Sequence, residues 1–247
     1  MKIVINQLRT FRTAAFNYKE ISPGKLKRKV KGVSSHEWLA RQNSDPYVEK
    51  AKMLNYRCRS AFKLIEIDDR FKILRPGYHV VDCGASPGSW TQVTVKRVNS
   101  DASDKSLLQG KVISVDRQLI YPIEGATLIG NADFTDPTSE QTIIKALNGN
   151  KCDAVISDMA PNATGIRDLD NENIIKLCYM VLKFAITNSK VGASVLMKLW
   201  QCGDSKKLEL DIGKFYEKVN VVKPKSSRSD STEMFLLGRE FKGLKNS

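Results

Sequence analysis

The segment HVVDCGASPGSW contains the first residues whose types and spacing indicate chemistry. Two valines end a predicted buried strand, and Asp82, Gly84, Pro87 and Gly88 follow in the turn before a predicted helix. A dinucleotide site uses the pattern G-x-G-x-x-G, whose N–H groups approach a pyrophosphate. This turn lacks the third glycine, and its proline has no N–H to donate. The pattern D-x-G-x-x-P-G therefore favours a cofactor without phosphates, and Asp82 suits the positive charge of S-adenosylmethionine.

Two later acids lie where the adenosine of that cofactor would need acceptors. Asp116 closes the next strand, VISVD, and an acid at that position can accept both ribose hydroxyls. Asp133, in GNADF after the third strand, is predicted to reach the adenine amino group. Aspartate is also common in ordinary turns. That interpretation stays open for both residues, and most of all for Asp133.

Methyl transfer to a hydroxyl also needs a group that aligns the hydroxyl and accepts its proton. The fourth predicted strand ends in SDMAPN and places Asp158 at the carboxyl edge of the sheet, beside the cofactor. The fifth reads SVLMKLW and contains Lys198, which is costly to bury in an apolar strand. We interpret Lys198 as a base whose ammonium is held by Asp158. The alternative is a strand-end lysine that extends its ammonium to solvent.

Strands and helices alternate along the chain in a way that places these residues at one sheet edge. Strand–helix alternation predicts an α/β fold with a mostly parallel sheet that helices cover on both faces. The predicted strands are 78–82, 112–116, 126–129, 154–157, 194–199, 219–222 and 234–237. The predicted helices are 47–52, 60–71, 89–98, 139–147, 171–188 and 205–216, and the polar residues 99–110 are predicted to form a loop.

Taken together, the motifs resemble the FtsJ-type ribosomal RNA 2′-O-methyltransferases, and most closely their mitochondrial large-subunit branch. The resemblance covers roughly residues 34–240 and rests on SSHEWLARQNSDPYVEKAK, YRCRSAFKLIEI, VVDCGASPGSW, SDMAPNATGIRDLD, VLMKLWQ and SSRSDSTEMFLL. It implies a Rossmann-like class I methyltransferase fold. It also implies a catalytic tetrad of Lys63, Asp158, Lys198 and Glu233. In that family the second lysine deprotonates or orients the ribose hydroxyl, Asp158 orients that lysine, and the other two position the ribose.

The same resemblance extends the predicted cofactor site to Ser89 and Trp90, which follow the turn. Two features differ from many family members. Ser86 stands where alanine is common, which we interpret as harmless. Arg117 and Gln118 stand where many members have a more apolar run after the second strand, so the adenine side of the site departs from the family pattern.

Basic residues flank the predicted tetrad on both sides in the sequence. Lys52, Arg57 and Arg59 precede it, and Lys223, Lys225 and Arg228 lead into its last member. Basic groups bind phosphates in most RNA sites, so we predict RNA contacts for all six residues. A solvated surface is the alternative for either cluster.

The net charge of +13 over 247 residues supports a polyanionic partner, but its distribution is uneven. Residues 1–35 contain nine Lys or Arg and one acid, so they carry +8 and leave +5 for the other 212. Such an acid-poor, helically patterned start is typical of a mitochondrial presequence, and a basic tail that touches RNA is the alternative. We therefore divide the chain into a basic presequence and linker (1–33), a methyltransferase domain (34–240) and a tail (241–247).

Five widely spaced cysteines without a CxxC pattern make disulfides and a zinc site improbable, and no metal site is predicted. No apolar run reaches the length of a membrane span.

The predicted activity, by resemblance, is 2′-O-methylation of a uridine in the peptidyl-transferase region of mitochondrial large-subunit rRNA. The partner would be that rRNA or a pre-ribosomal large subunit, the protein a monomer and the compartment the mitochondrial matrix. A nucleolar or cytoplasmic protein is the alternative location. The competing functions are methylation of a tRNA anticodon loop and ribosome assembly through RNA binding alone. Methylation of a small molecule is the least favoured function.

Overall fold

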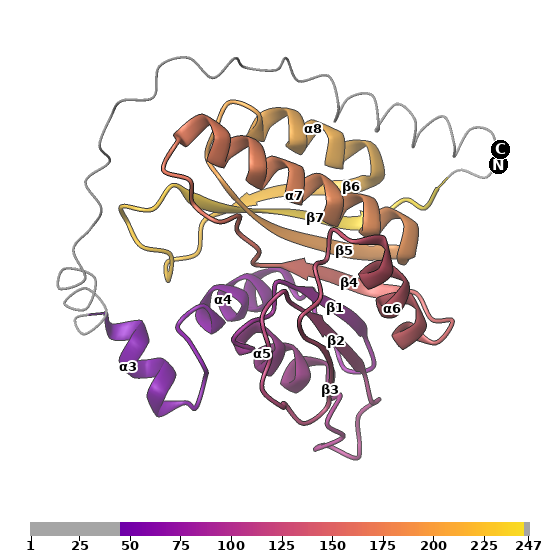
Figure 1. The fold of residues 1–247 in the computed structure, drawn as a ribbon. Helices are drawn as coiled ribbons and strands as arrows, with labels where there is room; N and C mark the ends of the chain where they lie inside the picture. Colours follow the sequence, from indigo (N-terminus) through magenta and orange to yellow (C-terminus); the bar gives the residue numbers. More distant parts are fainter. Residues whose placement is uncertain (1–44, 245–247) are drawn as a thin grey trace.

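Seven strands form one sheet in this computed structural model, which describes residues 45–244. Their spatial order is β3-β2-β1-β4-β5-β7-β6 (Figure 1). The strand bounds are β1 His79–Cys83, β2 Lys111–Val115, β3 Ala126–Ile129, β4 Cys152–Ser157, β5 Ser189–Trp200, β6 Tyr216–Val222 and β7 Glu233–Phe241. Only β7 runs against its neighbours, since it pairs antiparallel with both β5 and β6. The predicted mostly parallel seven-stranded sheet is confirmed.

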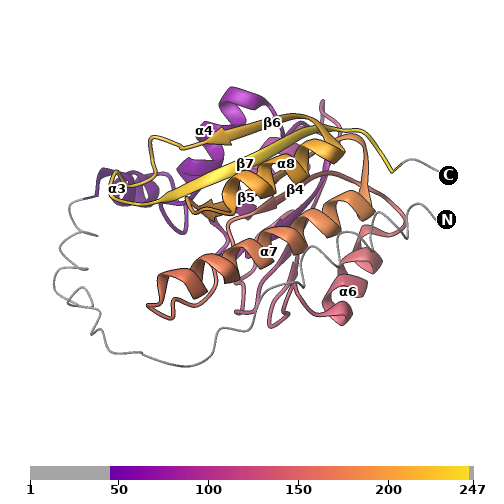
Figure 2. The same ribbon diagram turned by 90° about the horizontal axis from the view of Figure 1, so that it is seen from above.

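Helices cover both faces of the sheet, as predicted, and each face has its own buried cluster. One cluster packs α6, α7 and α8 against the sheet, and the other packs α4 and α5 against the opposite face. Figure 2 shows α4 on one side of the strands and α6, α7 and α8 on the other. The helix bounds are α3 Pro46–Met53, α4 Ala61–Phe71, α5 Ser89–Val98, α6 Pro137–Leu147, α7 Arg167–Asn188 and α8 Ser205–Phe215.

The helix starts follow from short capping segments. Asp45 accepts the N–H of Tyr47 before α3, and Asp136 accepts the N–H of Thr138 before α6, each followed by a proline at the first helical position. α6 therefore begins two residues before the predicted residue 139. α7 begins at Arg167 instead of residue 171, because Asp168 and Asp170 lie in its first turn.

The late strands are longer than the hydrophobic pattern predicts. β5 begins at Ser189 instead of residue 194, and its next three residues are exposed. β7 continues to Phe241, which pairs with Tyr216 at the sheet edge. The backbone hydrogen bonds of these strands continue past the hydrophobic segments from which the strands were predicted.

Residues 1–33, the predicted presequence and linker, lie outside the described residues. Within the described part of the chain, no helix is both long and apolar enough to cross a membrane.

Candidate active site

Four elements bring the predicted tetrad to the carboxyl edge of the sheet. Lys63 lies in the first turn of α4, Asp158 follows the last residue of β4, and Lys198 is the third-last residue of β5. Glu233 is the first residue of β7 and pairs with Trp200, the last residue of β5. The structure therefore places the four side chains in two contacting pairs, as the following distances show.

Lys198 and Asp158 form the first pair. The Lys198 Nζ atom lies 2.9 Å from Asp158 Oδ1 and donates to the Asp158 carbonyl oxygen at 2.5 Å. The second carboxylate oxygen, Oδ2, accepts a hydrogen bond from Ser60 Oγ at 2.5 Å. Burial raises the pKa of Asp158, but the Lys198 and Lys63 ammoniums and the Ser60 hydrogen bond outweigh it and lower that pKa below its ordinary value. Asp158 is therefore an ionised partner for Lys198.

Lys63 and Glu233 form the second pair. Lys63 Nζ donates to Glu233 Oε2 at 2.7 Å, and both side chains are nearly nine-tenths covered. Glu233 Oε1 accepts from Ser227 Oγ at 2.9 Å, so both of its oxygens have donors. The Lys63 ammonium also lies 5.9 Å from the centre of the Phe235 ring. These contacts fix the pair beside the first one, where Lys63 acts electrostatically on Asp158.

The predicted cofactor residue Trp90 supports the site from within the core. Its side chain is 2% exposed and packs against Phe235 with ring centres 5.8 Å apart. The indole N–H donates to the Ser60 carbonyl oxygen at 2.9 Å. Trp90 therefore holds the backbone of the residue that binds Asp158, and its indole has little surface left for a ligand.

Asp82 has the features of a site for a positive charge. Its side chain is fully buried at the end of β1, where Oδ2 accepts from Thr91 Oγ1 at 2.8 Å and Oδ1 has no partner. Burial, with smaller contributions from the Asp158 and Asp116 carboxylates, raises the pKa of Asp82 to about 7 against the lowering effect of the Thr91 bond. An unpartnered buried carboxylate oxygen is costly unless a donor reaches it. The ammonium of S-adenosylmethionine would supply that donor.

The two turn glycines are required by neighbours within the protein. A Cβ atom on Gly84 would lie 2.3 Å from the Met159 side chain, directly after Asp158. A Cβ atom on Gly88 would lie 2.6 Å from Ile123 and 2.8 Å from Arg57. Both glycines have positive φ, +77° and +114°, which other residues rarely adopt. Pro87 between them is exposed and follows a cis peptide bond. Contacts within the protein therefore disfavour a side chain at either glycine, and their contact with the cofactor stays a prediction.

The predicted adenosine acceptors, Asp116 and Asp133, follow β2 and β3, and both already accept hydrogen bonds from the protein. Asp116 Oδ2 accepts the N–H of Ser86 at 2.8 Å, and its Oδ1 accepts the N–H of Gln118 at 2.7 Å. Asp133 accepts the N–H and hydroxyl of Thr135. A carboxylate has about four acceptor positions, so Asp116 keeps capacity for ribose hydroxyls. The contacts of Asp133 are those of a turn acid, and its contact with adenine stays a prediction.

The six predicted RNA contacts divide into two groups. Lys52 and Lys225 are exposed, and Lys223 is exposed with its ammonium on the Ser231 carbonyl oxygen. The three arginines are engaged within the protein. Arg59 and Arg228 both pair with Asp45, and Arg57 donates to three backbone carbonyls.

Two residues that sequence reasoning missed hold the site together. Ser60 precedes α4 and looks like an ordinary helix cap, but it makes no side-chain cap bond and donates to Asp158 instead. Glu66 accepts the N–H groups of Lys225 and Ser226, which ties the segment before β7 to α4. The polar positions of α4 gave no signal for this contact, because its partner lies 159 residues away.

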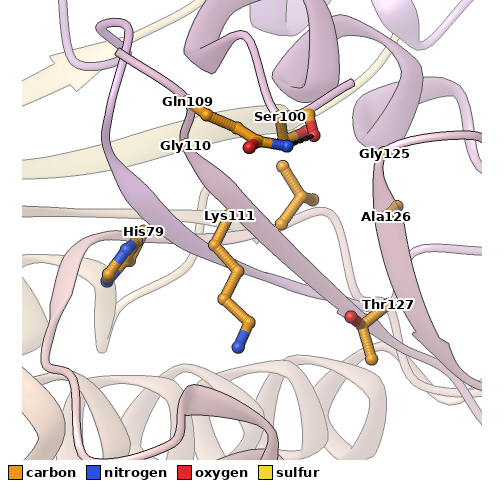
Figure 3. A pocket seen from close by; sticks show the side chains of 9 residues that line it. His79, Ser100, Gln109, Gly110, Lys111, Gly125, Ala126 and Thr127 are labelled. Carbon is orange, nitrogen blue, oxygen red and sulfur yellow. Dashed lines mark hydrogen bonds between the residues drawn. The ribbon is translucent and has the colours of Figure 1, made fainter. Parts of the chain in front are cut away.

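An open hollow of about 450 Å³ lies elsewhere on the molecule, at the amino-terminal ends of β1, β2 and β3. Figure 3 shows His79, Lys111 and Thr127 around it. The tetrad occupies the opposite ends of the strands, so this hollow does not belong to the candidate active site.

The fold and the site define a Rossmann-like methyltransferase, and comparison with known proteins gives its family. Residues 56–241 match the FtsJ-like methyltransferase family, so the chain belongs to that family. FtsJ-like methyltransferases use S-adenosylmethionine, which confirms the predicted cofactor.

Relatives agree over nearly the whole chain. "rRNA methyltransferase 2, mitochondrial" of Drosophila melanogaster is 52% identical over 230 residues, which cover 93% of this chain and 91% of that protein. "Ribosomal RNA large subunit methyltransferase E" of Roseobacter denitrificans is 40% identical and covers 88% of this chain and 92% of its own length. A solved Plasmodium falciparum chain described as a ribosomal RNA methyltransferase has a TM-score of 0.67 at 25% identity, over 76% of this chain and all of that one.

Proposed function

We propose that this protein transfers a methyl group from S-adenosylmethionine to a ribose 2′-hydroxyl of large-subunit rRNA. The observation that carries the proposal is the Lys198 ammonium, which Asp158 holds through one carboxylate oxygen and one carbonyl oxygen. Lysine has three N–H positions, so one remains to bind a substrate hydroxyl. The rRNA substrate is supported by relatives that are named as rRNA methyltransferases.

The cofactor would be held by residues at the ends of adjacent parallel strands. Asp82 Oδ1 suits its ammonium, the turn from Gly84 to Gly88 with Ser89 suits its amino-acid portion, and Asp116 suits its ribose. Asp133 at the end of β3 is the candidate for the adenine amino group. When bound, the cofactor supplies an electrophilic methyl group on a sulfonium.

Lys198 would act on the other reactant. As an ammonium, Lys198 would donate an N–H to the 2′-hydroxyl oxygen. As an amine, its nitrogen would accept the hydroxyl proton while that oxygen bonds to the methyl carbon and the bond from this carbon to the sulfonium sulfur breaks, which leaves a neutral thioether and a Lys198 ammonium. Asp158 fixes the position of Nζ, and Ser60 fixes the carboxylate of Asp158. Lys63 and Glu233 lie beside this pair, where they would orient the ribose. Alignment of hydroxyl and methyl is the main contribution of such a site.

The finer assignment follows the Drosophila relative, whose name includes the word mitochondrial. We propose a uridine of mitochondrial large-subunit rRNA as the target, in naked rRNA or a pre-ribosomal particle, and the mitochondrial matrix as the location. The basic, acid-poor start of the chain supports this location. We also propose a monomer, as the family resemblance implies.

The activity test uses the full chain with S-adenosylmethionine carrying a labelled methyl group. Large-subunit rRNA, immature large subunits and tRNA serve as separate substrates. Lys198→Ala is the test variant, and Lys145→Ala, an exposed lysine on α6, is the matched control. A 2′-O-methyl group blocks alkaline cleavage, so label in an alkali-resistant dinucleotide from rRNA supports the proposal if Lys198→Ala removes it. Label confined to tRNA, or cofactor binding without transfer to any RNA, would overturn the rRNA assignment.

A second test concerns the exposed lysines before Glu233. Changing Lys223 and Lys225 to alanine should raise the RNA Michaelis constant about tenfold and reduce the salt dependence of RNA binding by about 1.5 logarithmic units per decade. Affinity for S-adenosylmethionine should stay unchanged. Lys145→Ala controls for loss of an exposed positive charge. Equal RNA kinetics in the double variant would show that this cluster is only a solvated surface.

A further inference from the structure

We propose that Arg57 is a positioning residue for the cofactor site and not a contact for RNA phosphate. The guanidinium joins two loops that leave the carboxyl ends of the adjacent strands β1 and β2. Its Nη1 atom donates to the carbonyl oxygens of Pro87 and Tyr121, and its Nη2 atom donates to that of Pro122, each at 2.8 Å. This proposal rests on the proposed use of S-adenosylmethionine at this edge.

The first loop, residues 84–88, is the turn that contains the cofactor motif. The second, residues 116–125, begins with Asp116, the candidate for the cofactor ribose. The loops have two direct links, both made by Ser86. Its N–H donates to Asp116 Oδ2 at 2.8 Å, and its hydroxyl donates to Gln118 Oε1 at 3.4 Å. The Arg57 guanidinium bridges the same loops, with one hydrogen bond to the first and two to the second. The guanidinium therefore fixes the spacing between the two sides of the proposed cofactor site.

The Arg57 backbone is itself fixed by α5. Its N–H donates to Gln92 Oε1 at 2.9 Å, and Gln92 Nε2 donates to the Asn55 carbonyl oxygen at 2.9 Å. A single glutamine side chain thus holds both ends of residues 55–57. The position of the guanidinium is determined by a helix and does not depend on a flexible surface segment.

Gly88 provides the space that the guanidinium needs. A Cβ atom at this position would lie 2.8 Å from Arg57 Nη1, closer than such atoms approach in proteins. The glycine of the cofactor motif and Arg57 are therefore matched to each other. This packing gives a reason for Gly88 besides its positive φ and besides any contact with a ligand.

The carbonyl contacts also weigh against a phosphate contact. Arginine has five N–H donors in one plane, and three of the Arg57 donors already have neutral acceptors at good distances. Binding a phosphate through both Nη atoms would require those bonds to be broken. Arg57 thus differs from Lys52, five residues earlier, which is exposed at the end of α3.

The test compares Arg57→Ala and Arg57→Lys with Lys52→Ala, which removes the same charge from the same region. Titration calorimetry on the full chain gives the dissociation constant for S-adenosylmethionine, and methyl-transfer kinetics give the RNA Michaelis constant. We expect Arg57→Ala to weaken cofactor binding at least tenfold while the RNA constant stays within twofold. Arg57→Lys should recover part of the affinity, because an ammonium can reach some of the three carbonyls. Lys52→Ala should leave cofactor binding unchanged.

Circular dichroism and urea unfolding identify any variant that fails to fold. If Arg57→Ala does not fold, the cofactor and RNA constants of Arg57→Lys are compared with those of the unaltered protein instead. An unchanged cofactor constant in Arg57→Ala with a raised RNA constant would overturn the proposal. If the unaltered protein bound no S-adenosylmethionine, the proposed function itself would fail, which is a separate result.

Discussion

Asp82 offers a direct test of the cofactor site, because its ionisation opposes folding of the cofactor-free protein. The side chain is fully buried and only one of its oxygens has a partner. Asp82→Asn keeps the shape and the acceptor for Thr91 but removes the charge. We expect the variant to lose the unfavourable pH dependence of stability and, at the same time, most of its affinity for S-adenosylmethionine.

The magnitude follows from the two pKa values of Asp82. The ordinary value is 3.8 and burial raises it to about 7, so between these values the folded protein keeps a proton that the unfolded chain has lost. The stabilising contribution is therefore complete below pH 3.8 and is lost as pH rises through about 7. At about 1.4 kcal/mol per pKa unit the whole loss is about 4 kcal/mol, of which about 2.5 kcal/mol falls between pH 5 and pH 8.

The asparagine variant has an offsetting cost that does not depend on pH. Its amide N–H₂ group would lie where Asp82 Oδ1 lacks a partner, and an unpaired buried donor costs about 1 to 3 kcal/mol. The stability difference at a single pH is therefore a poor test. The change of that difference with pH isolates the ionisation of Asp82.

Urea unfolding at several pH values between about 5 and 8 measures this change. The stability of the wild type relative to Asp82→Asn should fall by about 2.5 kcal/mol across the range. Asp69→Asn, at an exposed carboxylate on α4, is the control and should show no comparable trend. Calorimetry should show wild-type cofactor affinity rising between about pH 5 and 7, as the carboxylate that binds the ammonium forms. A difference between wild type and Asp82→Asn that stays flat with pH would refute the raised pKa and the argument built on it.

Two further predictions concern the catalytic pairs. Ser60→Ala removes a hydrogen bond that lowers the pKa of Asp158, so the acid limb of the kcat/KM profile should move to higher pH and kcat should fall about tenfold. Ser60→Thr keeps the hydroxyl and should restore both. An acid limb that does not move would contradict the role of this hydroxyl. Alanine at Lys63 or Glu233 leaves the other charge unpaired, so each should lower kcat by about 100-fold and the double variant should be no worse than the poorer single one. Additive losses in that double-mutant cycle would show that the two side chains act separately.

Several parts of this site could be predicted from the sequence because they depend on strand ends. Asp82, Asp116 and Asp158 each end or follow a hydrophobic run, and parallel strands bring such positions to one edge of the sheet. Lys198 was recognisable as a charge in an otherwise apolar strand. The family resemblance added Lys63 and Glu233, which no local pattern distinguishes from other polar residues.

The remaining contacts depend on tertiary packing and left no local signal. Trp90 looked like a cofactor residue because it follows the motif, but the direction of its side chain depends on the position of Phe235 in a distant strand. Arg57 is predicted to contact RNA because it is basic, and that contact stays a prediction; its acceptors within the protein are backbone carbonyls 30 to 65 residues away, which no local pattern indicates. Composition identifies a charge, whereas only the fold determines which acceptors surround it.

The reversed direction of β7 explains how Glu233 reaches the other members of the tetrad. Asp158 and Lys198 lie at the carboxyl ends of parallel strands, but Glu233 is the first residue of its strand. In a parallel strand the first residue would lie at the opposite edge, near His79 and Lys111, which begin β1 and β2. Antiparallel pairing instead places Glu233 opposite Trp200, two residues after Lys198. The one antiparallel strand of the sheet is thus the element that joins the Lys63–Glu233 pair to the Lys198–Asp158 pair.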